Sequence, residues 1–340
     1  MHALVTGGSG YFGCVLVSEL LARGYDVSVF DRVDVPDRSD KVRYLRGDIR
    51  DEPAVTRACE GVDVVHHNVA QVPIAKDRKL FWSVNVEGTK NLVRAAQKQN
   101  VKKTVIVSSS AVFGVPQSNP VTERTEPRPQ EDYGRAKLEG ERIARGARNL
   151  DVTIIRPRTI LGHERLGIFQ ILFEWVFRGK PVWVLGGGDN RYQFVHCFDL
   201  ADACIRAGER PGPATYNIGA ERFGSMRQAL EALVTHAGSG SRVRSLPMTS
   251  TVKLMEWASK LGISPLGAYH SLMYGREMFF DVTAAKIDLG WASRYSNEEM
   301  FIESYDRYVA HRSEILARTG ASHHRSPLGM GILKLLEYLP

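Results

Sequence analysis

The chain has 340 residues, of which 43% are hydrophobic and 24% are charged, and its formal net charge is +7. This balance is typical of a globular protein with a sizeable core, large enough for one α/β domain and a smaller appended part. No apolar run approaches the roughly 20 residues that span a bilayer, and the first residues lead directly into a glycine turn. We therefore expect no membrane span, no signal peptide and a cytoplasmic location.

The cysteines, the histidines and the charge pattern argue against further kinds of site and partner. No two of the four cysteines form a C-x-x-C pair, so we expect reduced thiols rather than a zinc site or a disulfide framework. The adjacent pairs His66-His67 and His323-His324 lack the helical spacing of metal ligands, and no metal site is predicted. The positive charge is spread along the chain, so nucleic acid is not predicted as a partner.

Short apolar runs alternate with amphipathic stretches through residues 1–160. The runs are rich in valine and isoleucine, as buried parallel strands are, and predict strands at Ala3–Thr6, Asp26–Phe30, Val42–Leu45, Val62–His66, Thr104–Ser108 and Val152–Ile155. The stretches between them predict helices at Tyr11–Arg23, Glu52–Cys59, Leu80–Gln99 and Glu131–Ala147. This alternation predicts an α/β fold, a doubly wound parallel sheet with helices on both faces.

The pattern changes after Pro157. Helices are predicted near Leu166–Phe177, Phe198–Gly208 and Ser225–His236, and short strands near Val182–Leu185, Tyr192–Val195 and Thr215–Ile218. An apolar stretch covers Val252–Tyr274, and a last helix runs from Asn297 to about Arg318. We predict that residues 161–320 form a smaller α/β substrate-binding region interleaved with residues 1–160, and that residues 321–340 form a tail.

The sequence TGGSGYFG, residues 6–13, follows the first predicted strand and opens the first predicted helix. Glycine permits a tight turn and lets the backbone approach a pyrophosphate, while the helix N-terminus offers free N–H groups. This strand–turn–helix context predicts a Rossmann-type NAD(P)-binding domain in residues 1–160. The predicted cofactor contacts here are Gly7, Gly10, Tyr11, Phe12 and Gly13.

Asp31 ends the second predicted strand, about 20 residues after the glycines, where the dinucleotide fingerprint places an acid. A carboxylate there hydrogen-bonds the adenosine ribose and repels a 2′-phosphate, which favours NAD over NADP. Arg32 is a counter-signal, because an adjacent guanidinium could pair with a 2′-phosphate. A solvated turn is the alternative for both residues.

Tyr133 and Lys137 lie four residues apart and share one face of the predicted helix. A lysine ammonium near a phenol lowers the phenol pKa from about 10, so the tyrosine can act as acid or base near neutral pH. Ser108-Ser109-Ser110 end another predicted strand, and ligands bind at the carboxyl ends of parallel strands. A hydroxyl there could hydrogen-bond the reacting oxygen, although a polar turn is the alternative.

Together these segments resemble the extended short-chain dehydrogenase/reductase family, which includes nucleotide-sugar epimerases, dehydratases and 3β-hydroxysteroid-type dehydrogenases. The resemblance extends to about residue 312 in family order. Its segments are TGGSGYFG (6–13), GDIRD (47–51), HHNVA (66–70), NVEGTKNLVRAA (85–96), SSSAVFG (108–114), YGRAK (133–137), IRPRTILG (155–162), QFVHCFDLADA (193–203), YNIG (216–219) and FDVTAAKIDLGW (280–291).

The resemblance implies roles for single residues. Asp48, with its neighbour Ile49, matches the position beside the adenine ring, and Ala70 lies where the loop after the fourth strand passes the cofactor. Pro157 opens the loop beside the nicotinamide. The catalytic hydroxyl falls on Ser109, with Ser110 as the alternative. Tyr133 matches the acid/base, and Lys137 the lysine that binds the nicotinamide ribose.

The substrate is less well defined. Dehydratase members follow a catalytic threonine with an Asp-Glu pair, whereas Ser109 is followed by Ser110-Ala111. Nucleotide-sugar members place an arginine four residues before the position of His196, where this chain has Tyr192. Arg191 lies one residue before this position. On a strand its side chain would point to the opposite face, unless a β-bulge turns it back to the expected face. The placement of Arg276 looks more like the 3β-hydroxysteroid-type members. Predicted substrate contacts are Ser110, Arg191 and Arg276.

Three hypotheses follow. The preferred one is an NAD-dependent nucleotide-sugar 4-epimerase with Tyr133 as acid/base. The second is a 3β-hydroxysteroid dehydrogenase-like oxidoreductase of an apolar alcohol or ketone, which the apolar stretch Val252–Tyr274 would suit. The third is a non-catalytic NAD(P)-sensing protein, which would have no need of Ser109, Tyr133 and Lys137 together.

The end of the chain lies beyond the resemblance. Ile332, Leu335, Leu336 and Leu339 share one helical face, which predicts a short amphipathic helix. Its single lysine, Lys334, gives little attraction to lipid, so docking on the protein is predicted rather than membrane contact. A homodimer is left open.

Overall fold

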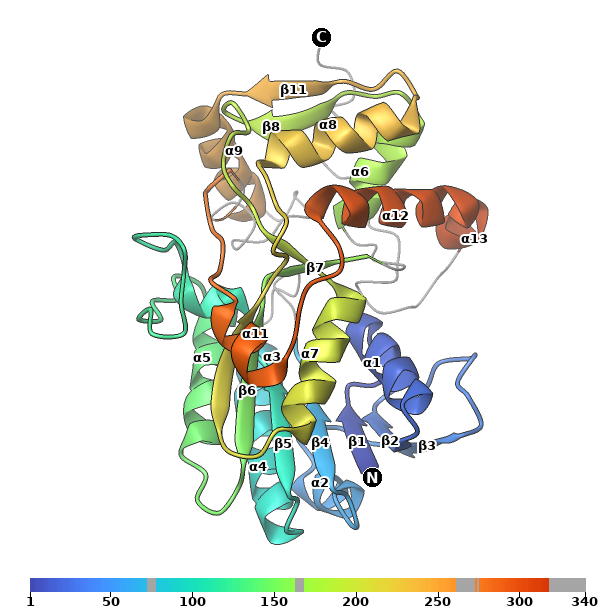
Figure 1. Cartoon of the computed structure of the whole chain (residues 1–340), viewed down its shortest axis with the longest axis vertical. Helices are drawn as coiled ribbons and strands as arrows, with labels where there is room; N and C mark the ends of the chain where they lie inside the picture. Colours follow the sequence, from blue (N-terminus) through green and yellow to red (C-terminus); the bar gives the residue numbers. More distant parts are fainter. Residues whose placement is uncertain (72–77, 163–167, 261–272, 274, 318–340) are drawn as a thin grey trace.

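The computed structural model describes residues 1–71, 78–162, 168–260, 273 and 275–317 (Figure 1). Its centre is a seven-stranded sheet in the order β10-β6-β5-β4-β1-β2-β3, and each neighbouring pair is parallel. The strands are β1 (His2–Thr6), β2 (Asp26–Asp31), β3 (Val42–Arg46), β4 (Val64–His67), β5 (Lys103–Val107), β6 (Val152–Pro157) and β10 (Ala214–Ile218). The predicted doubly wound parallel sheet is confirmed.

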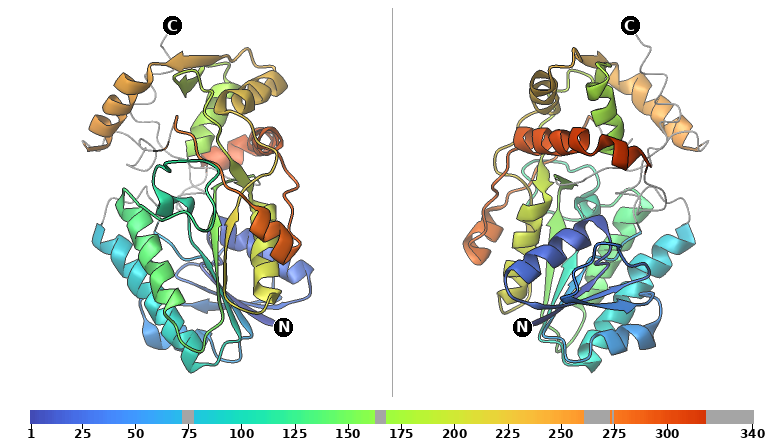
Figure 2. Two further views of the ribbon diagram at one scale, coloured as in Figure 1. Left: turned by 60° about the vertical axis from the view of Figure 1, so that its left-hand side comes forward. Right: turned by 90° about the vertical axis from the view of Figure 1, so that its right-hand side faces the viewer.

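Helices cover both faces of this sheet, as Figure 2 shows. On one face α1 (Tyr11–Ala22) packs beside α7 (Cys197–Glu209). On the other face lie α2 (Glu52–Ala58), α4 (Gly88–Lys98) and α5 (Asp132–Arg145). Because both faces are covered, every residue of β5 and β6 is buried. Burial on both faces explains why these strands appear in the sequence as continuous apolar runs.

The second part of the molecule lies above the carboxyl ends of the strands in Figure 1. Two small parallel pairs belong to it, β8 (Val182–Leu185) with β11 (Val243–Leu246), and β7 (Thr159–Leu161) with β9 (Phe194–His196). Its helices are α6 (Ile168–Phe177), α8 (Met226–Ala237), α9 (Met248–Lys260), α12 (Asn297–Ala310) and α13 (Arg312–Ala317). The chain returns to the main sheet through α7 and β10, so the two parts interleave. The boundaries at 160 and 320 remain predictions.

Two predicted helices differ from the structure. The one predicted at Leu80–Gln99 is α3 (Arg78–Trp82), a π-helical turn (Ser83–Glu87) and α4. In that turn the buried Asn85 bonds both backbone polar groups of Gln71, which ties the turn to the loop after β4. The last predicted helix is divided at His311 into α12 and α13. Apolar periodicity cannot show such interruptions, because the side chains on both sides keep a buried face.

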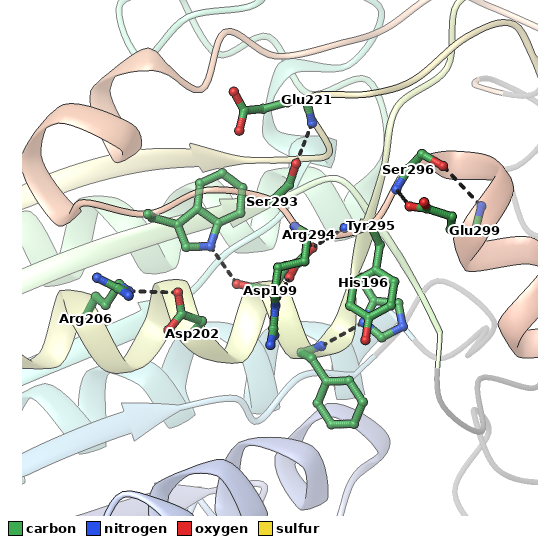
Figure 3. A network of polar contacts seen from close by, with 12 residues as sticks. His196, Asp199, Asp202, Arg206, Glu221, Ser293, Arg294, Tyr295, Ser296 and Glu299 are labelled. Carbon is green, nitrogen blue, oxygen red and sulfur yellow. Dashed lines mark hydrogen bonds and ion pairs between the residues drawn. The ribbon is translucent and has the colours of Figure 1, made fainter.

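A polar network joins the second part to α7 (Figure 3). Asp199, which is 1% exposed, accepts hydrogen bonds from the backbone nitrogen of Arg294 at 3.0 Å and from its Nε at 2.9 Å. The indole nitrogen of Trp291 donates to the Asp199 carbonyl at 2.8 Å. The ring of Tyr295 stacks on His196, with centroids 3.7 Å apart. The segment between α11 (Thr283–Leu289) and α12 is thereby held against α7.

In the part of the chain that the structure describes, no helix is long and apolar enough to cross a membrane. The cysteines are free thiols, with Cys59, Cys197 and Cys204 buried. Part of the apolar stretch Val252–Tyr274 and the tail 321–340 lie outside the described residues.

Candidate active site

The turn between β1 and α1 leaves no room for a side chain at Gly7 or Gly13. A Cβ atom on Gly7 would lie 2.9 Å from the backbone nitrogen of Val69, and one on Gly13 would lie 2.1 Å from the carbonyl oxygen of Gly7. Gly7 also has a φ of +74°, which favours glycine. Gly10 is the N-cap of α1 and offers no side-chain hydrogen bond. The first N–H groups of α1 therefore have no side-chain cap and are suited to a phosphate.

Tyr11 and Phe12, two other predicted cofactor contacts, have buried side chains. The Tyr11 hydroxyl donates to the carbonyl of Gly162, at the end of β7. The Tyr11 side chain thus joins α1 to the second part, and the Phe12 side chain lies in the hydrophobic core. Their cofactor contacts remain predictions, for which the backbone N–H groups of the first turn of α1 are available.

Asp31 lies at the end of β2, next to the glycine turn. One of its carboxylate oxygens accepts from the backbone nitrogen of Ser9 at 3.0 Å, and the other from that of Arg32 at 2.7 Å. Sequence reasoning missed Arg38, whose Nη2 donates to Ser9 Oγ at 2.7 Å and whose side chain pairs with Asp34. Arg38 pairs with Asp34 rather than with Asp31. The carboxylate of Asp31 lies beside the glycine turn, where it was predicted.

The side chains of Asp48 and Ile49 differ in environment. Arg50 Nη2 donates to Asp48 at 2.6 Å and holds the pKa of that carboxyl below its usual range. Arg32 Nε lies 3.6 Å from the same carboxylate, so the guanidinium that was the counter-signal to NAD lies beside an acid. Ile49 is 4% exposed and belongs to the core under α4. Ala70 is half-buried, beside Gln71, which Asn85 holds.

The first turn of α5 packs closely on the segment after β5. The N-cap Glu131 accepts hydrogen bonds from the backbone nitrogens of Tyr133 at 2.7 Å and Gly134 at 2.6 Å. A Cβ atom on Gly134 would lie 2.4 Å from the carbonyl oxygen of Ala111. Glycine at this position lets the backbone around Tyr133 approach the backbone that follows Ser109.

Lys137 lies one turn along α5, and its Nζ donates to the carbonyl of Val107 at 3.0 Å. Burial lowers the pKa of Lys137 to about 8, while the carboxylate of Glu141 opposes this shift. Burial, and then the charge of Lys137, lower the pKa of His67 to about 3. His67 is therefore neutral near pH 7, and Lys137 is the cation on the face of α5 that carries Tyr133.

The two candidate serines have different environments. Ser109 is half-buried and caps a 3₁₀ turn (Ser110–Phe113), where its Oγ accepts from the backbone nitrogen of Ala111 at 3.1 Å. As an acceptor there, the hydroxyl keeps its own proton for a second bond. Ser110 is 2% exposed, and its Oγ accepts from Arg158 Nη1 at 3.0 Å. This accessibility favours Ser109 as the hydroxyl that meets a substrate.

The guanidinium near these serines is that of Arg158, which the sequence analysis did not single out. The only feature of the sequence that could have indicated Arg158 is its place directly after β6, in Arg156-Pro157-Arg158. The predicted Arg191 instead stacks on Phe223 and Phe279, with its guanidinium carbon 4.9 and 4.3 Å from the ring centroids.

Tyr192, the residue after Arg191, faces Arg158 at 4.7 Å. The guanidinium of Arg191 instead contacts Phe223 and Phe279, which are different rings from those on Arg158. Arg276 is exposed, and its carbonyl accepts from Asn190 at 3.3 Å. The substrate roles of Arg191 and Arg276 remain predictions.

The residues present fit a dinucleotide. The Cβ-free turn at Gly7 and Gly13 and the uncapped first turn of α1 suit a pyrophosphate, and Asp31 suits a ribose hydroxyl. The ammonium of the half-buried Lys137 reaches the carbonyl of Val107, the last residue of β5, and Pro157 is the last residue of the neighbouring β6. In an open α/β sheet, ligands bind at these ends.

Comparison with known proteins agrees with this geometry. Residues 3–219 match the model of the NAD dependent epimerase/dehydratase family. "Uncharacterized protein y4nG" of Sinorhizobium fredii (strain NBRC 101917 / NGR234) is 54% identical over 339 residues, which cover 99% of this chain and 85% of that protein. A 3-beta-hydroxysteroid dehydrogenase of Mycolicibacterium neoaurum is 29% identical, with 91% of each chain covered. A UDP-glucose 4-epimerase of Mycolicibacterium smegmatis (strain ATCC 700084 / mc(2)155) is 30% identical, with 70% of this chain and 83% of that protein covered.

Among solved structures, MoeE5 in complex with UDP-glucuronic acid and NAD superposes with a TM-score of 0.74 and 25% identity. The match covers 92% of this chain and 100% of MoeE5. The family match spans more than half of the chain, and this similar structure contains NAD. The chain therefore belongs to the NAD dependent epimerase/dehydratase family, among the extended short-chain dehydrogenases/reductases, and is an NAD-dependent enzyme.

Proposed function

We propose that the protein is a nucleotide-sugar 4-epimerase, which oxidises a sugar hydroxyl and reduces the resulting ketone on its other face. The observation that carries this proposal is the arrangement after β5: a half-buried Ser109, the first turn of α5 with Tyr133, and the half-buried Lys137 one turn further. The relative named UDP-glucose 4-epimerase supports it, as does MoeE5, which was solved with a nucleotide sugar.

Each residue of this group has a proposed task. The phenolate of Tyr133 removes the proton of the reacting hydroxyl and later returns it. The ammonium of Lys137 favours that phenolate, and the hydroxyl of Ser109 donates a hydrogen bond to the reacting oxygen. The glycine turn, Asp31 and Lys137 would hold NAD, which would supply the acceptor and donor of the hydride. Because Ser109 is followed by Ser110-Ala111 rather than by two acids, this group suits epimerisation better than elimination.

The second candidate is a 3β-hydroxysteroid-type dehydrogenase that releases the ketone. The near-complete match to the 3-beta-hydroxysteroid dehydrogenase favours it, as does the apolar lining around Arg158, which includes Met278 and Phe280. The same three residues would serve this reaction. The two candidates differ in substrate and in the fate of the ketone.

Product analysis separates them. The enzyme with NAD is incubated with UDP-glucose, UDP-galactose, UDP-glucuronic acid or a 3β-hydroxysteroid, and sugars, ketones and NADH are measured. We expect interconversion of epimers without net formation of NADH. Formation of a ketone from the steroid, with an equal amount of NADH, would support the second candidate instead.

The serines provide a test of the assignment after β5. We expect Ser109→Ala to lower kcat by about tenfold or more, because the hydrogen bond to the developing oxyanion is lost. Ser110→Ala should cost less in kcat, because the Ser110 hydroxyl is buried against Arg158. Steady-state kinetics of both variants check this. A larger fall in kcat for Ser110→Ala would show that the catalytic hydroxyl has been assigned one residue too early.

A further inference from the structure

Arg158 is a buried cation at the carboxyl end of β6, one residue beyond Pro157. It is 1% exposed, and its backbone nitrogen donates to the carbonyl of Ile218, the last residue of β10. The residue therefore has a fixed backbone position at the sheet edge where ligands of this fold bind. Its side chain extends toward Ser110, the neighbour of Ser109.

The guanidinium of Arg158 is only partly satisfied. Nη1 donates to Ser110 Oγ at 3.0 Å and contacts the sulfur of Met278 at 3.2 Å. Nε and Nη2 are buried and have no hydrogen-bond partner. The rings of Tyr192 and Phe280 lie on the group, with centroids at 4.7 and 5.7 Å. Aromatic faces stabilise a cation, but they accept no conventional N–H hydrogen bond.

Two other buried cations of the sheet are paired with acids. Arg156, two residues earlier, forms two hydrogen bonds with the carboxylate of Glu141, at 2.9 and 2.6 Å. Lys103 on β5 lies 2.7 Å from a carboxylate oxygen of Asp151. Among the described residues, no such carboxylate pairs with Arg158, whose hydrogen bonds go to Ser110 and Met278.

A buried guanidinium without an acid is costly to folding, and an unsatisfied buried donor calls for an explanation such as a bound anion. The two nitrogens left over, Nε and Nη2, form one edge of a planar fork that matches the two oxygens of a carboxylate or phosphate. The fork also lies against Tyr192. That residue occupies the position at which the resemblance to nucleotide-sugar enzymes led us to expect an arginine.

We propose that Arg158 binds an oxyanion of the substrate, a carboxylate or a phosphate group, beside the carbon that reacts at Ser109 and Tyr133. This inference rests on the proposed function and narrows its substrate class to molecules with such a group near the reacting hydroxyl. Arg158 is thus a specificity residue. It takes the cationic role that Arg191 was predicted to have.

The test uses two variants of Arg158 and one control. Arg158→Met removes the charge but keeps a long apolar side chain between the two rings, and Arg158→Lys keeps the charge but loses the fork. The control is Arg222→Met, an exposed arginine that pairs with Glu299 at 2.7 Å. Affinities of the NAD-loaded proteins for UDP, UDP-glucose and UDP-glucuronic acid are measured by calorimetry, together with the melting temperature and NAD affinity of each protein.

We expect Arg158→Met to weaken anion binding by about 10- to 100-fold, as loss of hydrogen bonds to a charged group does. If the sugar carboxylate is the ligand, only UDP-glucuronic acid loses affinity. If a phosphate is the ligand, all three compounds lose it by a similar factor. Arg158→Lys should recover part of the affinity, and Arg222→Met should match the wild type. Unchanged affinity of all three compounds for Arg158→Met would overturn the proposal.

One result separates this proposal from the proposed function. If the wild-type protein binds none of the three compounds, the nucleotide-sugar assignment fails, and acetate and inorganic phosphate become the probes. A rise in melting temperature with either ion for the wild type but not for Arg158→Met keeps the oxyanion site. Equal responses of the two proteins, or no response from either, reject it. If Arg158→Met does not fold, the same comparisons are made with Arg158→Lys.

Discussion

Replacing Tyr133 with phenylalanine should lower kcat by about 100-fold or more while leaving the affinity for NAD unchanged. Phenylalanine keeps the ring at the first turn of α5 but removes the exchangeable proton. The N-cap bonds from Glu131 reach backbone nitrogens, so they survive the change. Steady-state kinetics with the substrate found by product analysis, and NAD titration, provide the measurements.

Tyr25→Phe is the matched control for this experiment. Its hydroxyl donates to Glu209 at 2.7 Å in an exposed bond far along the chain from α5. We expect kcat of Tyr25→Phe to equal that of the wild type. If Tyr133→Phe also keeps its turnover, Tyr133 is not the acid/base and the match to the YGRAK segment is accidental.

Replacing Lys137 with methionine should also lower kcat by about 100-fold or more, because the cation proposed to favour the Tyr133 phenolate is lost. The control is Lys102→Met, since Lys102 is an exposed lysine paired with Asp63. Full turnover of Lys137→Met would show that Tyr133 needs no cation. The Lys137→Met variant should also weaken NAD binding if the lysine holds the nicotinamide ribose, as the resemblance implies.

The lowered pKa of Lys137 leads to a second prediction, which concerns how the free energy of unfolding depends on pH. Its pKa falls from 10.5 to about 8 because it is buried. Below pH 8 both the folded and unfolded chains carry the proton, and the cost of burying the charge is present in full. Between pH 8 and 10.5 only the unfolded chain carries it, so the cost fades. The unfolding free energy of the wild type should therefore rise by about 3 kcal/mol relative to Lys137→Met over that interval. A constant difference would contradict the burial of a charged lysine.

The sheet was predictable because its strands are buried on both faces and therefore appear as continuous apolar runs. The glycine turn was equally predictable, since only glycine fits where a Cβ on Gly13 would lie 2.1 Å from a carbonyl oxygen. Local sequence determines both features. The π-helical turn at Ser83–Glu87 was not predictable, because a distant partner, Gln71, fixes it through Asn85.

The proposed substrate contacts were harder to predict for the same reason. Arg191 was singled out by its distance in sequence from His196, but a shift of one residue directs it to Phe223 and Phe279 instead. Arg158 gave no spacing signal. Its partners come from the segments after β5, before β9 and after residue 274, which only the folded chain brings together.

The proposed epimerisation requires that the sugar is oxidised and reduced at one carbon without release of the ketone. The most direct measurement uses UDP-glucose with deuterium at carbon 4 of the glucose, incubated with the enzyme and NAD. We predict UDP-galactose that retains the deuterium at carbon 4, with no net accumulation of reduced NAD. A ketone product with an equal amount of deuterated NADH, or no conversion of this or any other nucleotide sugar, would contradict the account.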